Sequence, residues 1–365
     1  MPVNHVLLNR LPNFLRIISF SVFACFWLIL PLSYAANDPA IDATVLIYHH
    51  FGVSKYPTTN VSIKNFQDQM EYLSANNYHV ISLTELVDAL KNKKPLPPKS
   101  VVITVDDGYK SVYQNGWPIL KSFGYPFTVF INAKSIDGGY SNYMSWVEVR
   151  EMHDSGVDFQ DHSYAHGRMA DRPKGFNDDE YRRWIHDDLV KNSEMISKRL
   201  AIKPKYFAIP YGEYNQLLMD EARKIGYEAV LPQDPGSVSQ YTDSYLIPRE
   251  PILGQNWARI KHFEEVLQRV DLPLSDMTPA YGIVEEVPPL FGARILNPGR
   301  YFSSSFQIYV SELGWLTPSL EGDILSAPGG KKLSRKLNRV MIKAQEKGSG
   351  KIAVRSWLLI RDKDI

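Results

Sequence analysis

The sequence predicts an α/β fold of parallel βα units, followed by a small antiparallel β domain. From residue 44 to about residue 270, short apolar runs typical of buried strands alternate with stretches of helical periodicity. After Leu272 prolines become frequent, and the segments beyond them alternate apolar and polar residues, as half-buried strands do. A chain of 365 residues has room for two domains at roughly 100–200 residues each.

The first part of the chain supplies the strands and helices of the parallel sheet. Its clearest strand is Val101–Val105, and its longest helix is the charged segment 178–200. Strands are expected where β-branched or aromatic residues form short runs, and helices where apolar residues recur three or four apart. The expected strands are 44–48, 79–82, 101–105, 127–132, 157–160, 206–209 and 229–231, and the expected helices are 66–76, 84–90, 111–123, 146–155, 178–200 and 216–225.

The second part is expected to begin after a proline-rich linker. Residues 36–271 would form the first domain, 272–284 the linker, and 285–365 a small β domain with a sandwich arrangement. Its expected strands are 302–310, 340–345 and 351–360, with a hairpin turn at 347–350.

The first 35 residues are typical of a secretory signal peptide. A basic leader is followed by the apolar run Ile17–Leu32 and by small residues at the exit, which predicts cleavage near Ala35. The run is about 16 residues long, short of the roughly 20 that span a bilayer, so cleavage is favoured over an uncleaved anchor. Cys25 lies in a weak lipobox-like context and is interpreted as a leader residue. We therefore expect an exported protein that is periplasmic, envelope-associated or secreted.

Charge and cysteine content exclude several classes of function. With 41 basic and 40 acidic side chains, the chain has no long-range field that would steer it to nucleic acid or to an anionic membrane. A single cysteine builds neither a disulfide framework nor a thiolate zinc site. Any metal must therefore be bound by nitrogen and oxygen ligands.

Two adjacent carboxylates, Asp106 and Asp107, follow the clearest strand and precede Gly108, which permits a tight turn. Because side chains alternate in direction along a strand, one carboxylate can bind a metal while the other acts as a base. The alternative is a pair that caps the next helix.

Two histidines four residues apart, His162 and His166, follow another expected strand. Catalytic groups of parallel barrels lie at the carboxyl ends of strands, and two histidines with one carboxylate leave a metal open to water and substrate. By itself, this spacing also arises by chance on protein surfaces. A third strand runs into the turn Pro210-Tyr211-Gly212, where the Tyr211 amide is a candidate donor to an oxyanion.

The ordered set of Asp106-Asp107-Gly108, His162-x-x-x-His166 and Pro210-Tyr211-Gly212 resembles the polysaccharide deacetylase family, also called the NodB-homology or carbohydrate esterase 4 family. Tyr48-His49 and Ile247-Pro248-Arg249 resemble its branch that deacetylates poly-β-1,6-N-acetylglucosamine of biofilm matrix. The resemblance covers roughly residues 44–270.

The resemblance implies a distorted (β/α)7 barrel and a metal site. Asp107, His162 and His166 match the family's metal ligands, usually for zinc, and Asp106 matches the catalytic base. The Tyr211 amide matches the oxyanion donor. His49 matches a histidine near the active site and is our first candidate for the general acid, with water or Asp106 as the second. Tyr109, Trp146, Pro210 and Arg249 are expected to contact substrate.

Two features depart from the family pattern. Many members carry an arginine before the proline motif that orients the base, whereas this chain has Ala208 there. Many also end in a Leu-x-His motif, whose nearest counterpart here, His262, lies in an amphipathic helical pattern and is interpreted as a surface residue.

The resemblance implies a metal-dependent N-deacetylase, which the predicted export would place on an extracytoplasmic polysaccharide, most simply poly-N-acetylglucosamine. Peptidoglycan, chitin oligomers and acetylated xylan are alternative substrates, and a catalytically silent glycan-binding protein is an alternative of another class. An iron(II) oxygenase, suggested by the spacing of His186-Asp187-Asp188, is disfavoured because those residues fall in a helical pattern. Envelope or export proteins are possible partners of the C-terminal domain. Its basic cluster is interpreted as a solvated surface rather than a site for an anion: Lys331, Lys332, Arg335, Lys336 and Arg339.

Overall fold

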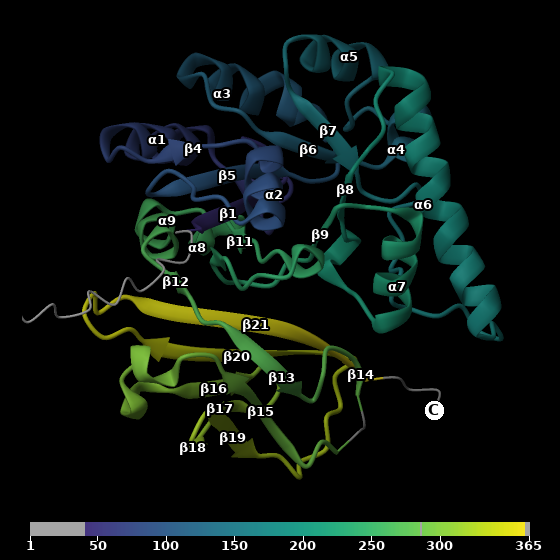
Figure 1. Cartoon of the computed structure of the whole chain (residues 1–365). Coiled ribbons are helices and arrows are strands. Elements are labelled where there is room, and N and C mark those ends of the chain that lie inside the picture. Colours follow the sequence, from purple (N-terminus) through teal and green to yellow (C-terminus); the bar gives the residue numbers. More distant parts are fainter. Residues whose placement is uncertain (1–40, 285–286, 362–365) are drawn as a thin grey trace, which may run out of the picture. The chain divides into compact units, whose positions relative to one another are not determined.

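A curled, mainly parallel sheet forms the centre of the first part of the chain (Figure 1). The computed structural model describes residues 41–284 and 287–361. Six parallel strands follow one another in the order of the chain and curl into a half-barrel: β1 (Asp42–Tyr48), β5 (Ser100–Val105), β6 (Thr128–Ile131), β7 (Asp158–Asp161), β8 (Tyr206–Ala208) and β9 (Ala229–Leu231). β5 is buried along its whole length, as expected for an apolar strand covered on both faces. The predicted seven repeats of the barrel stay a prediction.

Short strands extend this sheet beside β1 and β5. β4 (His79–Val80) pairs with β5, β11 (Glu250–Pro251) pairs with β1 in parallel, and β10 (Val238–Ser239) pairs with β1 antiparallel. A separate two-stranded pairing joins β2 (His50–Phe51) to β3 (Asn60–Val61).

The helices lie between the strands, and local caps explain where they begin. Capping boxes start α2, α5 and α6, each with a Ser or Asn cap and a glutamate three residues later, at Ser82, Ser145 and Asn177. The α-helices are α1 (Ile63–Ala75), α2 (Leu83–Asn92), α3 (Trp117–Phe123), α4 (Ala133–Asp137), α5 (Trp146–Asp154), α6 (Asp178–Leu200), α7 (Gln216–Ile225), α8 (Gly254–Trp257) and α9 (Ile260–Leu267).

Shorter helical turns complete this set. A π-helical turn at Val112–Gly116 precedes α3, so the helix expected over 111–123 is divided in two. Turns of 3-10 helix lie at Pro210–Gly212, Ser244–Leu246, Pro298–Arg300 and Ser303–Ser305. The predicted helix 178–200 is confirmed, because its capping box and its apolar positions agree.

Two further sheets follow the barrel strands. One has six strands: β12 (Val270–Asp271), β14 (Gly282–Val284), β16 (Gln307–Val310), β17 (Gly314–Leu316), β20 (Leu337–Gln345) and β21 (Ile352–Arg361). The other has four: β13 (Leu274–Thr278), β15 (Leu290–Ile295), β18 (Ser319–Glu321) and β19 (Ile324–Pro328). Both sheets contribute to one buried apolar cluster, which a sandwich needs, and the sandwich itself stays a prediction.

The expected linker and the expected antiparallel pairing need correction. Residues 272–284 contain β13 and most of their length is paired, because β14 joins β21. β12 and β14 both pair with β21 in parallel, so the six-stranded sheet is mixed. The strand expected at 302–310 is confined to β16, since a 3-10 turn occupies 303–305.

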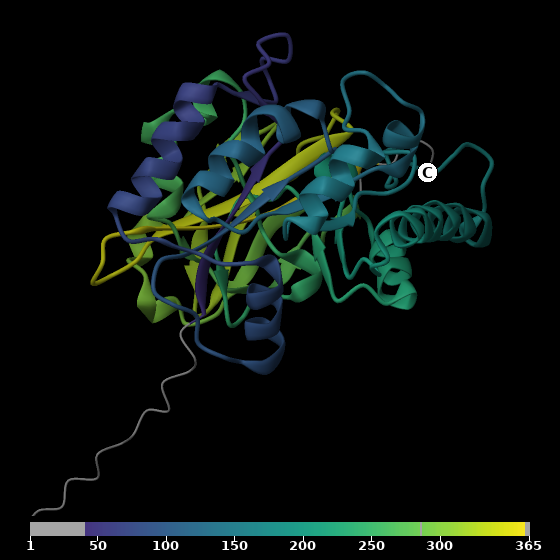
Figure 2. The same ribbon diagram turned by 90° about the horizontal axis from the view of Figure 1, so that it is seen from above.

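The long strand β21 runs beneath the barrel, as the view from above also shows (Figure 2). Its Leu358 and Ile360 share a buried cluster with the barrel residues Phe207 and Leu218. From the neighbouring strand β20, Arg339 donates from Nε to Asp234 Oδ1 at 3.0 Å. The C-terminal strands are thus packed directly on the barrel.

The predicted signal peptide, its cleavage near Ala35 and Cys25 lie outside the described residues. Among the helices that the structure does describe, none combines the length and the apolar character needed to cross a membrane.

Close strand packing predicts that Gly292 of β15 does not tolerate a side chain. A Cβ there would lie 2.1 Å from the carbonyl oxygen of Leu325 in the neighbouring strand β19. We expect Gly292→Ala to lower the free energy of unfolding by about 1–3 kcal/mol, measured by urea denaturation. Gly299→Ala, where nothing lies within 4 Å, is the matched control and should change stability by less than about 0.5 kcal/mol. Equal stability of the two variants would contradict this packing.

Candidate active site

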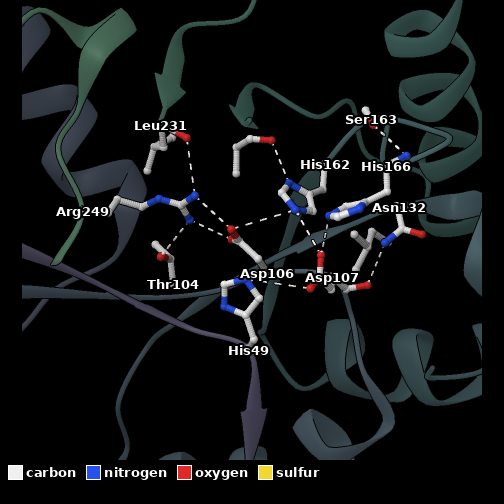
Figure 3. A network of polar contacts seen from close by, with 12 residues as sticks. His49, Thr104, Asp106, Asp107, Asn132, His162, Ser163, His166, Leu231 and Arg249 are labelled. Carbon is white, nitrogen blue, oxygen red and sulfur yellow. Dashed lines mark hydrogen bonds and ion pairs between the residues drawn. The ribbon is translucent and has the colours of Figure 1, made fainter. Parts of the chain in front are cut away.

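Two carboxylates lie side by side at the end of β5. Asp106 is fully buried, Asp107 is 3% exposed, and the amide of Asp106 donates to the carbonyl of Tyr48 on β1 at 3.0 Å. The chain then turns sharply, because Asp107 and Gly108 both have positive φ, 74° and 76°. A Cβ on Gly108 would lie 2.9 Å from the Ile131 side chain, so the turn requires glycine. The pair therefore does not cap a helix, and each carboxylate faces a different partner (Figure 3).

Asp106 is held by Arg249. The guanidinium makes two parallel hydrogen bonds, Nη1 to Oδ1 at 2.7 Å and Nη2 to Oδ2 at 2.9 Å, and neither side chain is exposed. Arg249 also donates from Nε to the carbonyl of Pro232 at 2.9 Å. Burial alone would raise the pKa of Asp106, but the charge of Arg249, followed by that of His162, holds it below its usual value. Asp106 is therefore an ionised carboxylate in fixed orientation.

The expected contact between Arg249 and substrate is wrong. Its guanidinium is completely buried, and its donors face Asp106, Thr104 and backbone carbonyls. Arg249 instead orients Asp106, although this chain departs from the family pattern of an arginine before the proline motif. The strand pattern did not show this, because the two segments meet only when the sheet curls.

Asp107 meets the two histidines. Its Oδ1 lies 2.8 Å from His166 Nε2 and 3.2 Å from His162 Nε2, and one ligand atom from each residue fits within 4.8 Å of the others. Among the described residues this is the one group of three or more such side chains that could hold a metal. His166 lies in the loop after β7 and not in a helix. The folding of this loop, and not helical periodicity, therefore brings His166 close to His162.

The donor set fits a divalent metal. His162 Nδ1 donates to the carbonyl of Ala208 at 2.7 Å, which fixes the tautomer and leaves Nε2 free to bind an ion. His162 Nε2 and Asp107 Oδ1 are both buried without a hydrogen-bond partner, a costly state that a cation would relieve. Burial would raise the pKa of Asp107, yet its close polar contacts with His162 and His166 hold it well below the usual value. An ionised carboxylate and two imidazoles are the ligands that zinc and similar ions take.

A buried polar network positions these ligands. Asn192 of α6 donates to the carbonyl of Ile131 at 2.9 Å and to Asp161 Oδ1 at 2.8 Å, and it accepts from the amide of Ala133 at 2.8 Å. Asp161 Oδ1 also accepts from the Ser163 amide at 2.8 Å. Burial raises the pKa of Asp161 to about 7. These residues join the ends of β6 and β7, and sequence patterns did not single them out because Asn192 lies within a long helix.

His49 lies at the site, directly after β1. Its Nε2 is 3.9 Å from Asp107 Oδ2, its Nδ1 is buried without a partner, and 8% of the residue is exposed. Burial lowers the pKa of His49, although the charges of Asp107 and Asp106 oppose the shift. The structure thus brings this histidine beside Asp107, one of the three residues that could hold a metal, and its predicted role in proton transfer stays a prediction.

Tyr211 has a strained backbone. Its φ and ψ are 60° and 0°, a left-handed conformation that is uncommon outside glycine. The ring is 45% exposed, contacts the His166 ring edge-on at 4.8 Å between centroids, and carries the Arg168 guanidinium over its face at 4.1 Å. Arg168 in turn pairs with the buried carboxylate of Glu213. The ring of Tyr211 therefore lies at the rim of the site, and the donor role of its amide stays a prediction.

The other three residues that were expected to contact substrate lie in different environments. Tyr109 lies at the site: its half-buried ring stacks on His50 at 3.7 Å, and burial followed by the negative charge of Asp107 raises its pKa. Pro210 is buried, so it fixes the turn rather than offering surface to a ligand. Trp146 is partly buried against the core at the start of α5, with the Arg199 guanidinium 5.3 Å from its ring, and its expected contact with substrate stays a prediction.

Two other histidines lie elsewhere. His262 is on α9, near Trp257, and is only partly exposed with its Nε2 buried, so its interpretation as a surface residue is not confirmed. His186 on α6 binds Glu221 at 2.7 Å through its Nδ1, so the oxygenase spacing has no matching metal cluster among the described residues.

Comparisons with known proteins support one family. The family model named Polysaccharide deacetylase matches residues 93–230. A putative polysaccharide deacetylase, YxkH of Bacillus subtilis, is 27% identical over 56% of this chain and 69% of its own length. The poly-β-1,6-N-acetyl-D-glucosamine N-deacetylase of Escherichia coli K12 is 28% identical over 56% of this chain, but the match spans 35% of that protein. The solved structure of IcaB from Ammonifex degensii matches with a TM-score of 0.52 and 26% identity, over 62% of this chain and 97% of that one.

The buried pair predicts a large effect of Arg249→Met. This change leaves the Asp106 carboxylate without a counter-charge, and we expect the free energy of unfolding to fall by about 3–5 kcal/mol in denaturant titrations. Adding Asp106→Asn should restore part of the loss, because it removes the uncompensated charge. Arg294→Met, which removes more exposed pairs with Asp276 and Asp323, is the control and should cost less than about 1 kcal/mol. If the two arginine variants are equally stable, Arg249 does not compensate the negative charge of Asp106.

Proposed function

Because the chain contains a polysaccharide deacetylase domain, which confirms the resemblance of its motifs, we propose that it hydrolyses N-acetyl groups of poly-β-1,6-N-acetylglucosamine outside the cytoplasm. The observation that carries the proposal is the division of the two carboxylates: Asp106 is fixed by Arg249, and Asp107 faces two histidines. A base beside a metal site is what amide hydrolysis needs.

In the proposed mechanism, Asp107, His162 and His166 hold a divalent metal, and zinc is our proposal for its identity. When bound, such an ion activates water and polarises the acetyl carbonyl. Asp106, oriented by Arg249, takes the proton of the attacking water. The Tyr211 amide donates to the developing oxyanion. His49 gives a proton to the leaving amine.

The choice of substrate rests on two observations. The E. coli relative is named as a poly-β-1,6-N-acetyl-D-glucosamine N-deacetylase. The chain's formal charge of +1 suits a neutral acetylated glycan, which needs no electrostatic steering. Peptidoglycan, chitin oligomers and acetylated xylan are the rival substrates.

A catalytically silent glycan-binding protein is less well supported than the sequence suggested. The apparent lack of a base-orienting arginine was one reason to consider it, and Arg249 now fills that position. Among the described residues, the structure does not identify a counterpart of the family's terminal histidine at the site. His49 therefore stays our first candidate for the general acid, with water or Asp106 as the second.

The central experiment is acetate release from defined glycans by metal-loaded protein, with and without chelator. We expect release from β-1,6-linked N-acetylglucosamine oligomers, its loss with chelator, and its recovery on adding zinc. Faster acetate release from peptidoglycan, chitin oligomers or xylan would identify that polymer as the substrate instead. Zinc-loaded protein with no turnover on any of them would favour a silent binder.

Asp106→Asn separates the base from the metal site. Asparagine keeps the size of the side chain but accepts no proton at neutral pH, so we expect acetate release to fall at least about 10²–10⁴-fold while bound metal is unchanged. Asp107→Ala and His162→Ala should lose the metal as well, measured as metal per protein. Asp276→Asn, an exposed residue of β13, is the control. A near-normal rate for Asp106→Asn would rule out its role as base.

His49→Ala tests the general acid. We expect kcat for acetate release to fall about 10²–10⁴-fold with bound metal unchanged, because the leaving amine loses its proton donor. His79→Ala on β4 is the control, since the side chain of His79 is exposed and makes its one hydrogen bond within the described part of the chain to the carbonyl of Pro98, at 2.8 Å. A His49→Ala rate within twofold of the wild type would transfer the role to water or to Asp106.

A further inference from the structure

A cavity of about 610 Å³ lies beside the proposed active site. One wall is the loop that runs from the metal ligand His166 to the start of α6, and the other is formed by β14, the end of β21 and Lys336, just before β20. The barrel and the C-terminal strands therefore build it together.

Chain connectivity places this cavity within reach of the reacting sugar. Ala170 in its wall follows His166 by four residues, and Asn215 in its wall follows Tyr211 by four residues. Four extended residues span at most about 14 Å, so the cavity wall begins within that distance of both His166 and Tyr211. Neighbouring units of a polymer whose reacting sugar lies beside His166 can span this distance.

The wall is built from buried polar groups. Asn215, 2% exposed, donates to the Tyr181 hydroxyl at 2.9 Å and to the carbonyl of Ala170 at 3.4 Å, and its Oδ1 caps α7 by accepting from the Leu218 amide at 3.0 Å. Across the cavity, Lys336 Nζ pairs with Asp171 of the loop. The C-terminal strands thus fix the loop that follows His166.

The lining carries net positive charge. It contains one carboxylate, Asp171, against four basic side chains, Arg172, Lys174, Lys336 and Arg361. Lys336 is neutralised by Asp171, and Arg172 pairs with Asp178 at 2.6 Å. Lys174 is exposed and has no ion pair with any of the residues that the structure describes. Its charge is therefore available to a ligand.

We propose that this cavity is a glycan subsite that accepts units still carrying their acetyl groups and rejects units that have already been deacetylated. An acetylated sugar is neutral, whereas the free amine of glucosamine is a cation at neutral pH and is repelled by the basic lining. The inference rests on the proposed function, since it concerns the glycan that the metal site would process. Its consequence is that deacetylation limits itself, and free amines are introduced apart from one another.

The test compares two β-1,6-linked oligomers of equal length, one fully acetylated and one with a single glucosamine, the latter as a set of positional isomers. For wild-type, metal-loaded protein we expect kcat/KM to be lower by about threefold or more when the amine falls next to the reacting unit. Lys174→Glu should remove or invert this difference, which is read as the ratio of the two kcat/KM values. Raising the salt from 0.05 to 0.5 M should reduce the difference for the wild type, because exposed charges are screened.

Lys94→Glu is the matched control. Lys94 is exposed in the loop that leads into the amino end of β5, whereas the site lies at the carboxyl end of that strand. The same change of charge at Lys94 should therefore leave the preference intact. Lys174→Gln, which removes the charge without adding a negative one, should give an intermediate preference.

Each outcome decides between the two proposals. Failure of the wild type to release acetate from either oligomer contradicts the proposed function. Acetate release with equal kcat/KM on both oligomers, or with a preference that Lys174→Glu leaves unchanged, overturns the subsite while the proposed function stands. In that case, tight binding of polyphosphate that Lys174→Glu abolishes would assign the cavity to an anionic polymer.

Discussion

The rest of the site depends on the burial of two adjacent carboxylates at the end of β5. Like charges so close together are stable inside a protein only if each has its own compensation. Asp106 obtains it from Arg249, which is brought in by the segment after β9, and Asp107 faces the two histidines of the loop after β7. The curled sheet is what makes this possible, because it brings segments from both sides of β5 to a single point.

The residues of the site were predictable to the extent that they are local in sequence. Asp106, Asp107, His162 and His166 stand directly after strands that short apolar runs revealed, and the structure brings all four together. The partner of Asp106 was not predictable in this way. Arg249 lies far along the chain and reaches the pair through tertiary packing, so its motif singled the residue out but did not reveal that its partner is Asp106.

The C-terminal part was harder to predict, for a different physical reason. Strands of two to five residues, such as β12, β13 and β14, are too short for alternation to stand out, and prolines around them suggested a linker. Pairing with the long strand β21 stabilises two of them, β12 and β14, and this pairing is invisible in local periodicity. The basic cluster at residues 331–339 was interpreted as a solvated surface. Two of its side chains instead form ion pairs with the barrel, Lys336 with Asp171 and Arg339 with Asp234. Charge there joins the two parts of the chain.

The left-handed backbone of Tyr211 sets thermal stability against activity at one position. A side chain with a Cβ costs of order 1–2 kcal/mol in this conformation, and glycine would avoid the cost. Selection for heat resistance alone would thus favour glycine at position 211 and remove the ring that contacts His166 and supports the Arg168 guanidinium. That a tyrosine occupies the position implies that its ring contributes something worth the strain. Replacement of Tyr211 to raise thermal stability therefore needs a screen that reads stability and acetate release together.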